Sequence, residues 1–522
     1  MKKLVIFLLF LLPLAACTDL DLKPKDGDVD AVVFRDPEAY RSYLAKVYAA
    51  FSHTGQQGPA GRPDISIVPD EGFTSYIRAY WKAQELTTDE AVIAWTDAGI
   101  RDMNDHNWSS ENQFVRVVYY RIFYIIAYAN DFLAQSTDAK LEANGISAAD
   151  RAVIQLYRAE ARFLRALAYW HALDLFRNVP ILTAISTELP VQGSPEELFS
   201  FIEGELNAIE SVMADPRTNE YGRADKAAVW MLQAKLYLNA QAQIGVDRYS
   251  DAATAAKKVI DAGYSLAANY PELFMADNDK ERDTELIFTL PADGIDAQNW
   301  GSTTFLVHGA IGGSMVDADY GVSGAWAGMR TTSAMVAKFS GATVPVAQDP
   351  RAIFYTDGQS LEITDIGTFT DGYAVPKFTN KTSAGGDGSN NTWCDTDYPM
   401  FRLADAYLIY AEAVLRGGTG SVGDAVGYIN LLRERAYGNN SANITQAQLT
   451  LDFVLDERVR ELYWEGTRRI DLIRYGRFTD QGIWPWKGGV AEGRLTESWR
   501  NIFPIPSSDL IANPRLKQNP EY

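Results

Sequence analysis

A helical repeat of apolar residues runs along most of this chain from Asp36 onward, and it limits the fold more than any other feature. Between Arg151 and Arg177, apolar residues recur at steps of three and four, namely Leu156, Ala159, Phe163, Leu167, Trp170 and Leu173. This spacing lines one face of an α-helix and is typical of a helix that packs on a core. Pro180 follows and cannot continue a helix. The pattern therefore predicts one long amphipathic helix.

Further segments carry the same helical spacing. They are Pro195–Met213, Asp225–Gln243, Tyr249–Ala262, Met400–Arg416, Val422–Tyr437 and Leu451–Tyr475. Several place alanine at close-packing positions, as in DKAAVWMLQAKLYLNA and RLADAYLIYAEAVL. Paired helices with small residues at their crossings are typical of tetratricopeptide (TPR) repeats, in which no unit buries its apolar face alone. Because no clean period of about 34 residues is present, we predict helix pairs that are only TPR-like.

The helical pattern stops between about residues 264 and 399, where the sequence is rich in Gly, Ser, Asp and Thr. Short apolar pieces such as ELIFTL and STTFLV indicate irregular loops with a few strands. We therefore predict a mostly α fold in which residues 36–522 form one unit. Its TPR-like helices cover about 36–262 and 400–475, and a loop-rich insertion of about 264–399 lies between them. Long ordered loops on a rigid base often carry binding residues.

The N-terminus has the order of a bacterial lipoprotein signal. Lys2 and Lys3 precede an apolar run from Leu4 to Leu14, and the sequence LAAC then ends at Cys17. The run is too short to span a bilayer, which needs roughly 20 apolar residues. The small residues before the cysteine predict a signal peptide at 1–16 that is removed once the Cys17 thiol carries lipid. The alternative is an ordinary secretory signal with a chance cysteine.

The stretch that follows the cysteine is acidic and poor in apolar residues, beginning TDLDLKPKDGD. Residues 17–35 therefore form a predicted lipidated tether, and no later apolar run is long enough to span a membrane. The chain contains only two cysteines, so lipidation of Cys17 leaves Cys394 without a partner. We predict no disulfide framework.

The charge balance limits the possible partners. The 48 basic and 68 acidic side chains give a formal net charge of −20. Attraction to nucleic acid or to an anionic lipid surface is therefore disfavoured, because both partners are negative. A neutral ligand suits this chain better.

No common catalytic motif is present. The four histidines, His53, His106, His171 and His308, lie far apart, and each is interpreted as a hydrogen-bonded surface or core residue. Nucleophile elbow, Walker loop and dinucleotide glycine patterns are absent from the sequence. A pair of carboxylates for glycoside hydrolysis stays open as an alternative, because such residues need only meet in space.

One acidic cluster, ADNDKERDTE, is a weak candidate for calcium through Asp277 and Asp279. It lacks the glycine that the turn of an EF-hand loop requires at its sixth position. We therefore favour a solvated acidic loop, and no cofactor is predicted.

Seven of the twelve tryptophans fall into two groups by their surroundings. Trp170, Trp230 and Trp464 fall on helical stripes and are predicted to be core residues. Four others lie among Gly, Asp and Asn residues in irregular sequence, namely Trp95, Trp300, Trp326 and Trp393. Exposed indole faces can bind the C–H face of a sugar ring while polar neighbours bind its hydroxyl groups. The alternative for these four is the closure of small satellite cores.

Several segments together resemble one family. They are RALAYWHALDLFRNVPIL, YPMFRLADAYLIYAEAVLR, ERVRELYWEGTRRIDLIRYG and FPIPSSDLIANPRLKQNPEY, with LDLKPKD near the start. In this order they are typical of the SusD-like (RagB/SusD) proteins, and the resemblance covers essentially the whole chain. It implies a TPR-like helical scaffold, a lipid anchor in the outer membrane facing the cell exterior, and a lid-like role over a SusC-like TonB-dependent transporter.

A sharper resemblance is to the founding, starch-binding member of that family. It rests on QELTTDEAVIAW, YGRADKAAVW, NYPELFMADND and CDTDYPMFRLADAYL. It implies an aromatic arc for α-1,4-glucan at Trp95, Trp300 and Trp326, with Trp300 standing where the founder has tyrosine. Polar contacts fall on Asp70 and Arg78.

The resemblance fails at one position, because Ala98 replaces an asparagine of the founder, and Asp97 is the nearest substitute. We expect the three rings to converge on one exposed surface, with Asp70 and Arg78 at its edge. The sequence thus predicts a non-enzymatic binder of starch or malto-oligosaccharides. The alternatives are another glycan, a peptide, or a glycoside hydrolase.

Overall fold

The computed structural model describes residues 33–55, 58–60, 63–67, 70–339 and 349–522. The predicted signal peptide, the lipidation site Cys17 and most of the predicted tether lie outside the described residues. In the part of the chain that is described, no helix is both long enough and apolar enough to cross a membrane.

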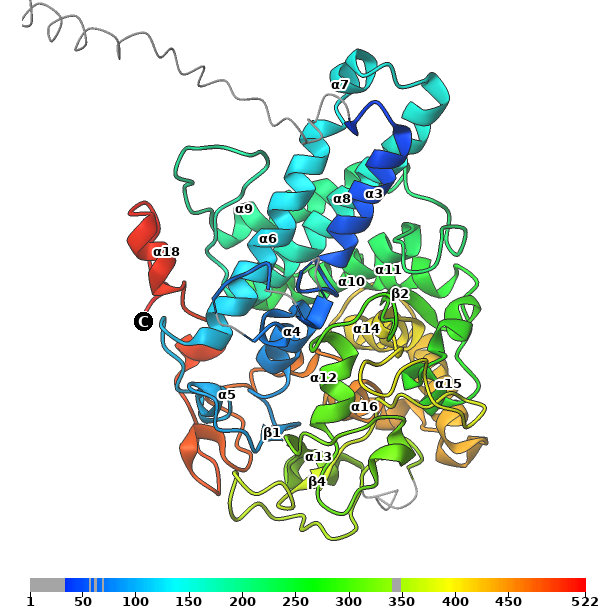
Figure 1. Ribbon diagram of the computed structural model, residues 1–522. Helices are drawn as coiled ribbons and strands as arrows, with labels where there is room; N and C mark the ends of the chain where they lie inside the picture. Colours follow the sequence, from blue (N-terminus) through cyan, green and yellow to red (C-terminus); the bar gives the residue numbers. More distant parts are fainter. Residues whose placement is uncertain (1–32, 56–57, 61–62, 68–69, 340–348) are drawn as a thin grey trace, which may run out of the picture.

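Helices dominate the structure, which confirms the predicted fold class (Figure 1). The α-helices of the described residues are α3 (Pro37–Ala49), α4 (Tyr76–Gln84), α5 (Ile100–Asp105), α6 (Gln113–Gln135), α7 (Asp138–Ala143), α8 (Ala148–Leu175), α9 (Pro195–Ile209), α10 (Lys226–Ile244), α11 (Tyr249–Ile260), α12 (Ser302–Gly309), α13 (Ser333–Phe339), α14 (Leu403–Leu415), α15 (Val422–Tyr437), α16 (Leu451–Leu462), α17 (Arg468–Arg474) and α18 (Ser507–Ala512).

Consecutive helices form a continuous array. Helix α6 packs on α8, α8 on α9, α9 on α10, and α10 on α11. Helix α14 then packs directly on α11, although more than a hundred residues separate them in the sequence, and α15 packs on α14. The long α6 and α8 rise together toward α7 at the top of the molecule (Figure 1). The loop-rich segment between α11 and α14 therefore leaves the helical array unbroken.

Local sequence explains both the start and the packing of these helices. The Asp225 carboxylate accepts hydrogen bonds from the backbone N–H groups of Ala227 and Ala228, and this cap begins α10. The alanines of α11 and α14 and all those of α10 except Ala242 are buried, which allows close approach of neighbouring helices. Helix α15 begins and ends where the periodicity predicts.

Short strands make two small sheets in the described residues. The antiparallel sheet β1–β3–β4 joins Val92–Ile93, Met329–Thr331 and Tyr373–Ala374. A second antiparallel pair joins β2 (Leu286–Leu290) to β5 (Tyr398–Arg402). The predicted strand in ELIFTL is therefore confirmed as β2.

Three predictions from the sequence pattern are wrong in detail. The segment STTFLV is helical and forms most of α12. The predicted helix Met400–Arg416 begins as strand β5, because its first residues pair with β2 before α14 starts. The predicted helix Leu451–Tyr475 is two helices, since Trp464 and Gly466 have φ values of 64° and 74° that no right-handed helix can contain.

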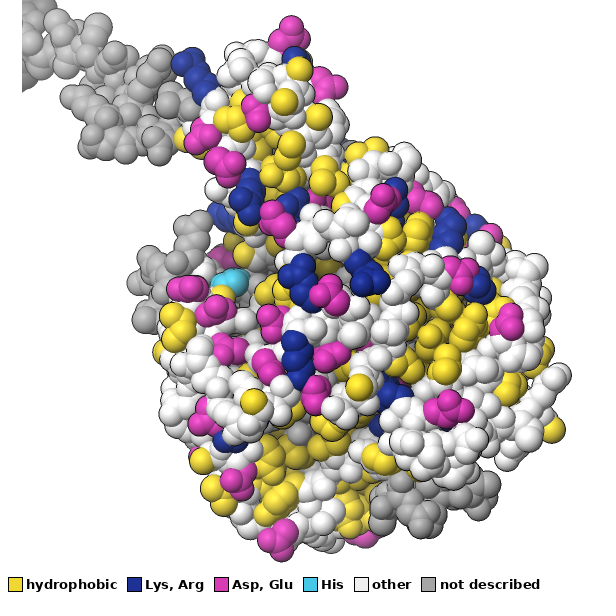
Figure 2. Space-filling view, turned by 90° about the vertical axis from the view of Figure 1, so that its right-hand side faces the viewer, with side chains coloured by type: hydrophobic (Ala, Val, Ile, Leu, Met, Phe, Trp, Pro, Cys, Tyr) yellow, Lys and Arg dark blue, Asp and Glu magenta, His cyan; other side chains and the backbone are white. Residues whose placement is uncertain are grey.

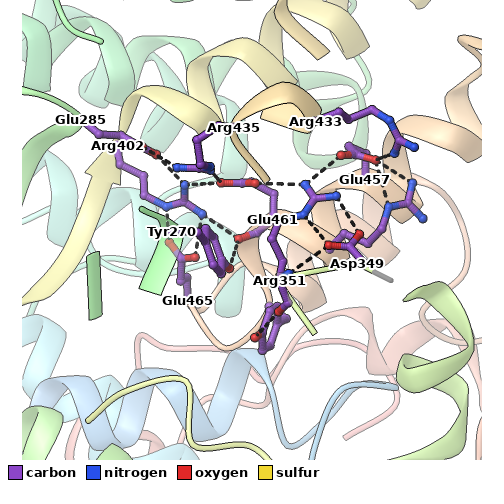
Figure 3. Close-up of polar contacts among 12 residues, drawn as sticks. Tyr270, Glu285, Asp349, Arg351, Arg402, Arg433, Arg435, Glu457, Glu461 and Glu465 are labelled. Carbon is purple, nitrogen blue, oxygen red and sulfur yellow. Dashed lines mark hydrogen bonds and ion pairs between the residues drawn. The ribbon is translucent and has the colours of Figure 1, made fainter. Parts of the chain in front are cut away.

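A buried ion network joins the second half of the chain (Figure 3). Arg402 bonds Glu285 and Glu461, each at 2.7 Å, and also Glu465 at 2.7 Å. Arg351 continues the network to the other oxygen of Glu461 at 3.1 Å. These five side chains are at most 4% exposed. Loss of one partner would leave charges without compensation in a region that excludes water.

Arg402 is the best place to test this network. We expect Arg402→Leu to lower the free energy of unfolding by about 3–5 kcal/mol, because three carboxylates lose their shared cation. Urea denaturation of Arg477→Leu supplies the control, since Arg477 pairs with Asp452 in side chains that are 38% and 71% exposed. That pair should contribute less than about 1 kcal/mol. Equal losses in the two variants would contradict a stabilising role for the network.

Candidate functional site

Three of the loop tryptophans meet in space. The ring centroids of Trp95 and Trp326 lie 6.2 Å apart with a 49° angle between planes. Those of Trp326 and Trp300 lie 6.1 Å apart at 48°. Trp326 is therefore the middle ring of a row, and we call Trp95, Trp326 and Trp300 the tryptophan platform. The predicted convergence of these residues is present in the structure.

Trp95 is fixed by the end of the small sheet. It lies two residues after the end of β1. The residue between them, Ala94, donates a backbone hydrogen bond to the carbonyl of Gly328 at 2.8 Å. The Trp95 indole Nε1 donates to the carbonyl oxygen of Trp326 at 2.9 Å. A Cβ atom on Gly328 would lie only 2.7 Å from the Trp95 ring, so glycine is needed there. The first two rings are thus held by direct contact.

Trp300 is fixed through its backbone by Glu71, which the sequence did not single out, and by the predicted residue Arg78. Its N–H donates to Oε2 of Glu71 at 3.0 Å, and its carbonyl accepts from Nη1 of Arg78 at 3.3 Å. Ser75 caps α4 and also accepts from the N–H of Ser302, at the start of α12, at 2.9 Å. The loop that carries Trp300 is therefore tied to the start of α4.

Trp326 rests on a histidine. The His308 ring stacks on it with centroids 4.9 Å apart and 22° between planes. The backbone N–H of Trp326 also donates to the backbone carbonyl of His308 at 2.9 Å. Burial lowers the pKa of His308, although contacts with the carbonyls of Gly324 and Thr392 partly raise it. We therefore assign His308 as a support for the ring.

Arg78 lies beneath the platform and not at its edge, which corrects the prediction from the sequence. It is 7% exposed, and its guanidinium lies 5.7 Å from the Trp95 ring and 6.0 Å from that of Trp326. Burial lowers the pKa of Arg78, and the charges of Asp70, Asp97 and Glu71 oppose that shift. The cation thus faces the undersides of the aromatic rings.

Asp70 is the solvent-facing polar residue of the predicted set. Its side chain is 54% exposed and reaches Nη2 of Arg78 at 3.8 Å. Asp97 and Ala98 are also exposed, but Ala98 has no polar side chain to offer. The indole N–H groups of Trp300 and Trp326 have no hydrogen-bond partner among the described residues and are not shielded from water. Donors and acceptors therefore border the row of rings.

The sequence analysis expected the three rings on an exposed surface, and in the structure they are half-buried. Trp95 packs against the buried Phe305 with centroids 6.0 Å apart. Removal of a ring will therefore cost some stability as well as a binding face. Rings that the protein supports on one side and leaves partly exposed suit a ligand that stacks.

Below the platform, a second aromatic layer connects it to the helical array. The Trp81 ring of α4 packs on Trp464 at 5.1 Å and on Phe305 at 5.7 Å. Glu85 and Glu90 hold the same turn: Glu85 accepts from the N–H groups of residues 466 and 467, and Glu90 accepts from that of Trp464. The site therefore stands on a buried layer rather than on flexible loops alone.

The calcium candidates, the predicted core tryptophans and Cys394 are not part of the platform. Asp277 accepts hydrogen bonds from the N–H and the hydroxyl of Ser383, at 2.8 and 2.6 Å. Across the described ranges, no group of three or more His, Cys, Asp or Glu residues is placed to hold a metal ion. Trp170 and Trp464 are buried, as predicted, and Trp230 is half-buried. Cys394 is a buried free thiol whose pKa is raised by burial.

Comparisons with known proteins agree with the family resemblance found in the sequence. A model of the SusD family matches residues 326–522. The chain is 36% identical to the starch-binding protein SusD of Bacteroides thetaiotaomicron, in an alignment that covers 97% of this chain and 95% of that protein.

Solved structures share the fold at lower identity. A SusD superfamily protein from Bacteroides vulgatus has a TM-score of 0.72 and is 19% identical, covering 94% of this chain and 100% of its own. Surface glycan-binding protein A from Bacteroides uniformis has a TM-score of 0.71 and is 20% identical, covering 93% of this chain and 99% of its own.

The carboxyl pair beneath the platform predicts a dependence of stability on pH. Burial raises the pKa of Glu85 well above its ordinary value of 4.5, and the neighbouring Glu90 raises it further. Burial also raises the pKa of Glu90. The folded pair therefore keeps a proton that the unfolded chain releases near pH 4.5, and the stability this contributes is lost as pH rises through the folded pKa.

We expect Glu90→Gln to flatten this dependence, because its amide replaces the protonated carboxyl without titrating. Between pH 5 and 8, the wild-type free energy of unfolding should fall relative to that of the variant, with a limiting slope of about 1.4 kcal/mol per pH unit. Urea denaturation at four pH values measures the difference. Parallel pH profiles for the two proteins would contradict a shared proton.

Proposed function

The chain belongs to the SusD family, and from that membership we propose that it binds an α-1,4-glucan, starch or a malto-oligosaccharide, at the cell surface. In this proposal the bound chain passes to a SusC-like TonB-dependent transporter. The protein captures its ligand without chemical change. The observation that carries the proposal is the tryptophan platform.

The geometry of the platform favours a curved ligand. Consecutive ring planes tilt by 49° and 48°, so a flat chain could lie on only one face at a time. A chain that turns from one sugar to the next can stack on each ring in succession. The relative that is 36% identical carries the name starch-binding protein, which agrees with such a ligand.

The polar groups around the rings fit a neutral, hydroxyl-rich molecule. Asp70 can accept from sugar hydroxyls, and the indole N–H groups of Trp300 and Trp326 can donate to them. Asp97 lies beside Ala98, where it can replace the amide that the resemblance leads one to expect. Acidic and basic side chains are interspersed over one face of the molecule (Figure 2), so no strong basic patch attracts a polyanion there.

We also propose that Cys17 carries the lipid that holds the protein on the outer membrane, facing outward. The support is the sequence LAAC after a short apolar run, together with the SusD family membership. A tethered binder raises the local concentration of long chains beside the transporter.

The first test measures glycan binding. In isothermal titration with maltoheptaose, we expect each of Trp95→Ala, Trp300→Ala and Trp326→Ala to weaken binding about fivefold, because one stack contributes on the order of 1 kcal/mol. The triple variant should show almost no binding. Trp499→Ala is the matched control, since Trp499 is also half-buried but packs on Tyr522 near the C-terminus.

Thermal melts of the same variants separate binding from folding. If the triple variant melts cooperatively and still binds maltoheptaose normally, the binding site lies elsewhere in the protein. Release of reducing ends from maltoheptaose that survives repurification would favour the glycoside hydrolase. Binding of another glycan or of peptides, with none of maltoheptaose, would change the ligand class.

The second test concerns the anchor and the partner. We expect the wild-type protein to fractionate with outer membranes, and to bring down a TonB-dependent barrel protein when mild detergent extracts are affinity purified. Cys17→Ala should leave the membrane fraction, because the acyl chains are its proposed attachment. Ala98→Ser serves as the control, because Ala98 is exposed and lies outside the predicted signal peptide and tether. A Cys17→Ala protein that still fractionates with outer membranes would contradict lipid anchoring.

A further inference from the structure

A fourth indole continues the tryptophan platform. The Trp393 ring lies 5.4 Å from that of Trp300, with 52° between planes. The two spacings within the platform are 6.1 and 6.2 Å, at 48° and 49°. The step from Trp300 to Trp393 therefore repeats the geometry of the steps before it, and the row reads Trp95, Trp326, Trp300 and Trp393.

The loop that carries Trp393 is fixed to the same elements as the platform. The N–H of Cys394 donates to Oγ1 of Thr304 on α12 at 3.1 Å. The ring of His308, which supports Trp326, contacts the carbonyl of Thr392 at 2.9 Å. The backbone of Gly294 also lies so close that a Cβ there would be 2.5 Å from the Trp393 carbonyl. The fourth ring is thus held in a defined position relative to the other three.

Part of the Trp393 ring remains open to solvent. Trp393 is half-buried, and its indole Nε1 is shielded from water without a hydrogen-bond partner. The partly open Trp393 ring therefore offers a surface beside Trp300 on which one more sugar can stack.

We propose that Trp393 forms an additional sugar-binding subsite at the Trp300 end of the platform, which only longer α-glucan chains reach. The inference rests on the proposed function and extends it to a preference for chain length. Short oligosaccharides are satisfied by the three rings of the platform. Longer ones gain one further stack, on a ring whose 52° tilt from Trp300 is similar to the tilts within the platform.

Titrations with two ligand lengths test the subsite. We expect Trp393→Ala to weaken maltoheptaose binding about fivefold and to leave maltotriose binding within about twofold of the wild type. Trp326→Ala should weaken binding of both ligands, because Trp326 is the middle ring. Trp393→Phe keeps an aromatic face and should retain most of the affinity for maltoheptaose.

The outcomes separate this inference from the proposed function. If the wild type binds maltoheptaose and Trp393→Ala binds it equally well, the subsite is wrong and the proposed function stands. If Trp393→Ala weakens both ligands equally and lowers the melting temperature, while Trp393→Phe restores neither, the ring is a packing residue and the subsite is again wrong. If the wild type binds neither ligand, the proposed function and the subsite fail together.

Discussion

The buried carboxylate and guanidinium groups around Arg402 are the constraint on which the rest of the structure depends. Arg402 ends strand β5, Glu285 precedes its partner β2, and Glu461 lies on α16, so one cation fixes three elements. Such a network adds little net stability over apolar packing, but each charge strongly disfavours any arrangement that leaves it unpaired. We interpret it as a device that specifies how the insertion rejoins the helical array.

A short series of contacts connects the ion network around Arg402 to the tryptophan platform. Glu465, which bonds Arg402, lies in the turn between helices α16 and α17. The carbonyl of Trp464 in this turn accepts from the indole of Trp81 at 3.2 Å, and Trp81 lies one turn beyond Arg78 on α4. The rings of the platform rest on Arg78. The ion network therefore positions a site whose residues it never touches.

The sequence predicted most helices because their apolar spacing and caps are local properties, as the bounds of α15 illustrate. The prediction failed where contacts with residues distant in the sequence determine the backbone conformation. Nothing in the periodicity of Leu451–Tyr475 reveals the left-handed residue Trp464, whose N–H bonds a carboxylate far away in the sequence. The site was predictable in its aromatic residues, through their surroundings and the family resemblance. The supports Glu71 and His308, and the burial of Arg78, arise only when distant loops meet.

Half-burial explains how one set of rings can be both rigid and available. A fully exposed indole would lose rotamer freedom on binding, which reduces the gain from each stack. A fully buried one would have no face to offer. In this protein a carbonyl holds the edge of the Trp95 ring, and the His308 ring and the Arg78 cation support the Trp326 ring. The ordering cost is therefore met when the chain folds, and several weak contacts with one ligand can add up.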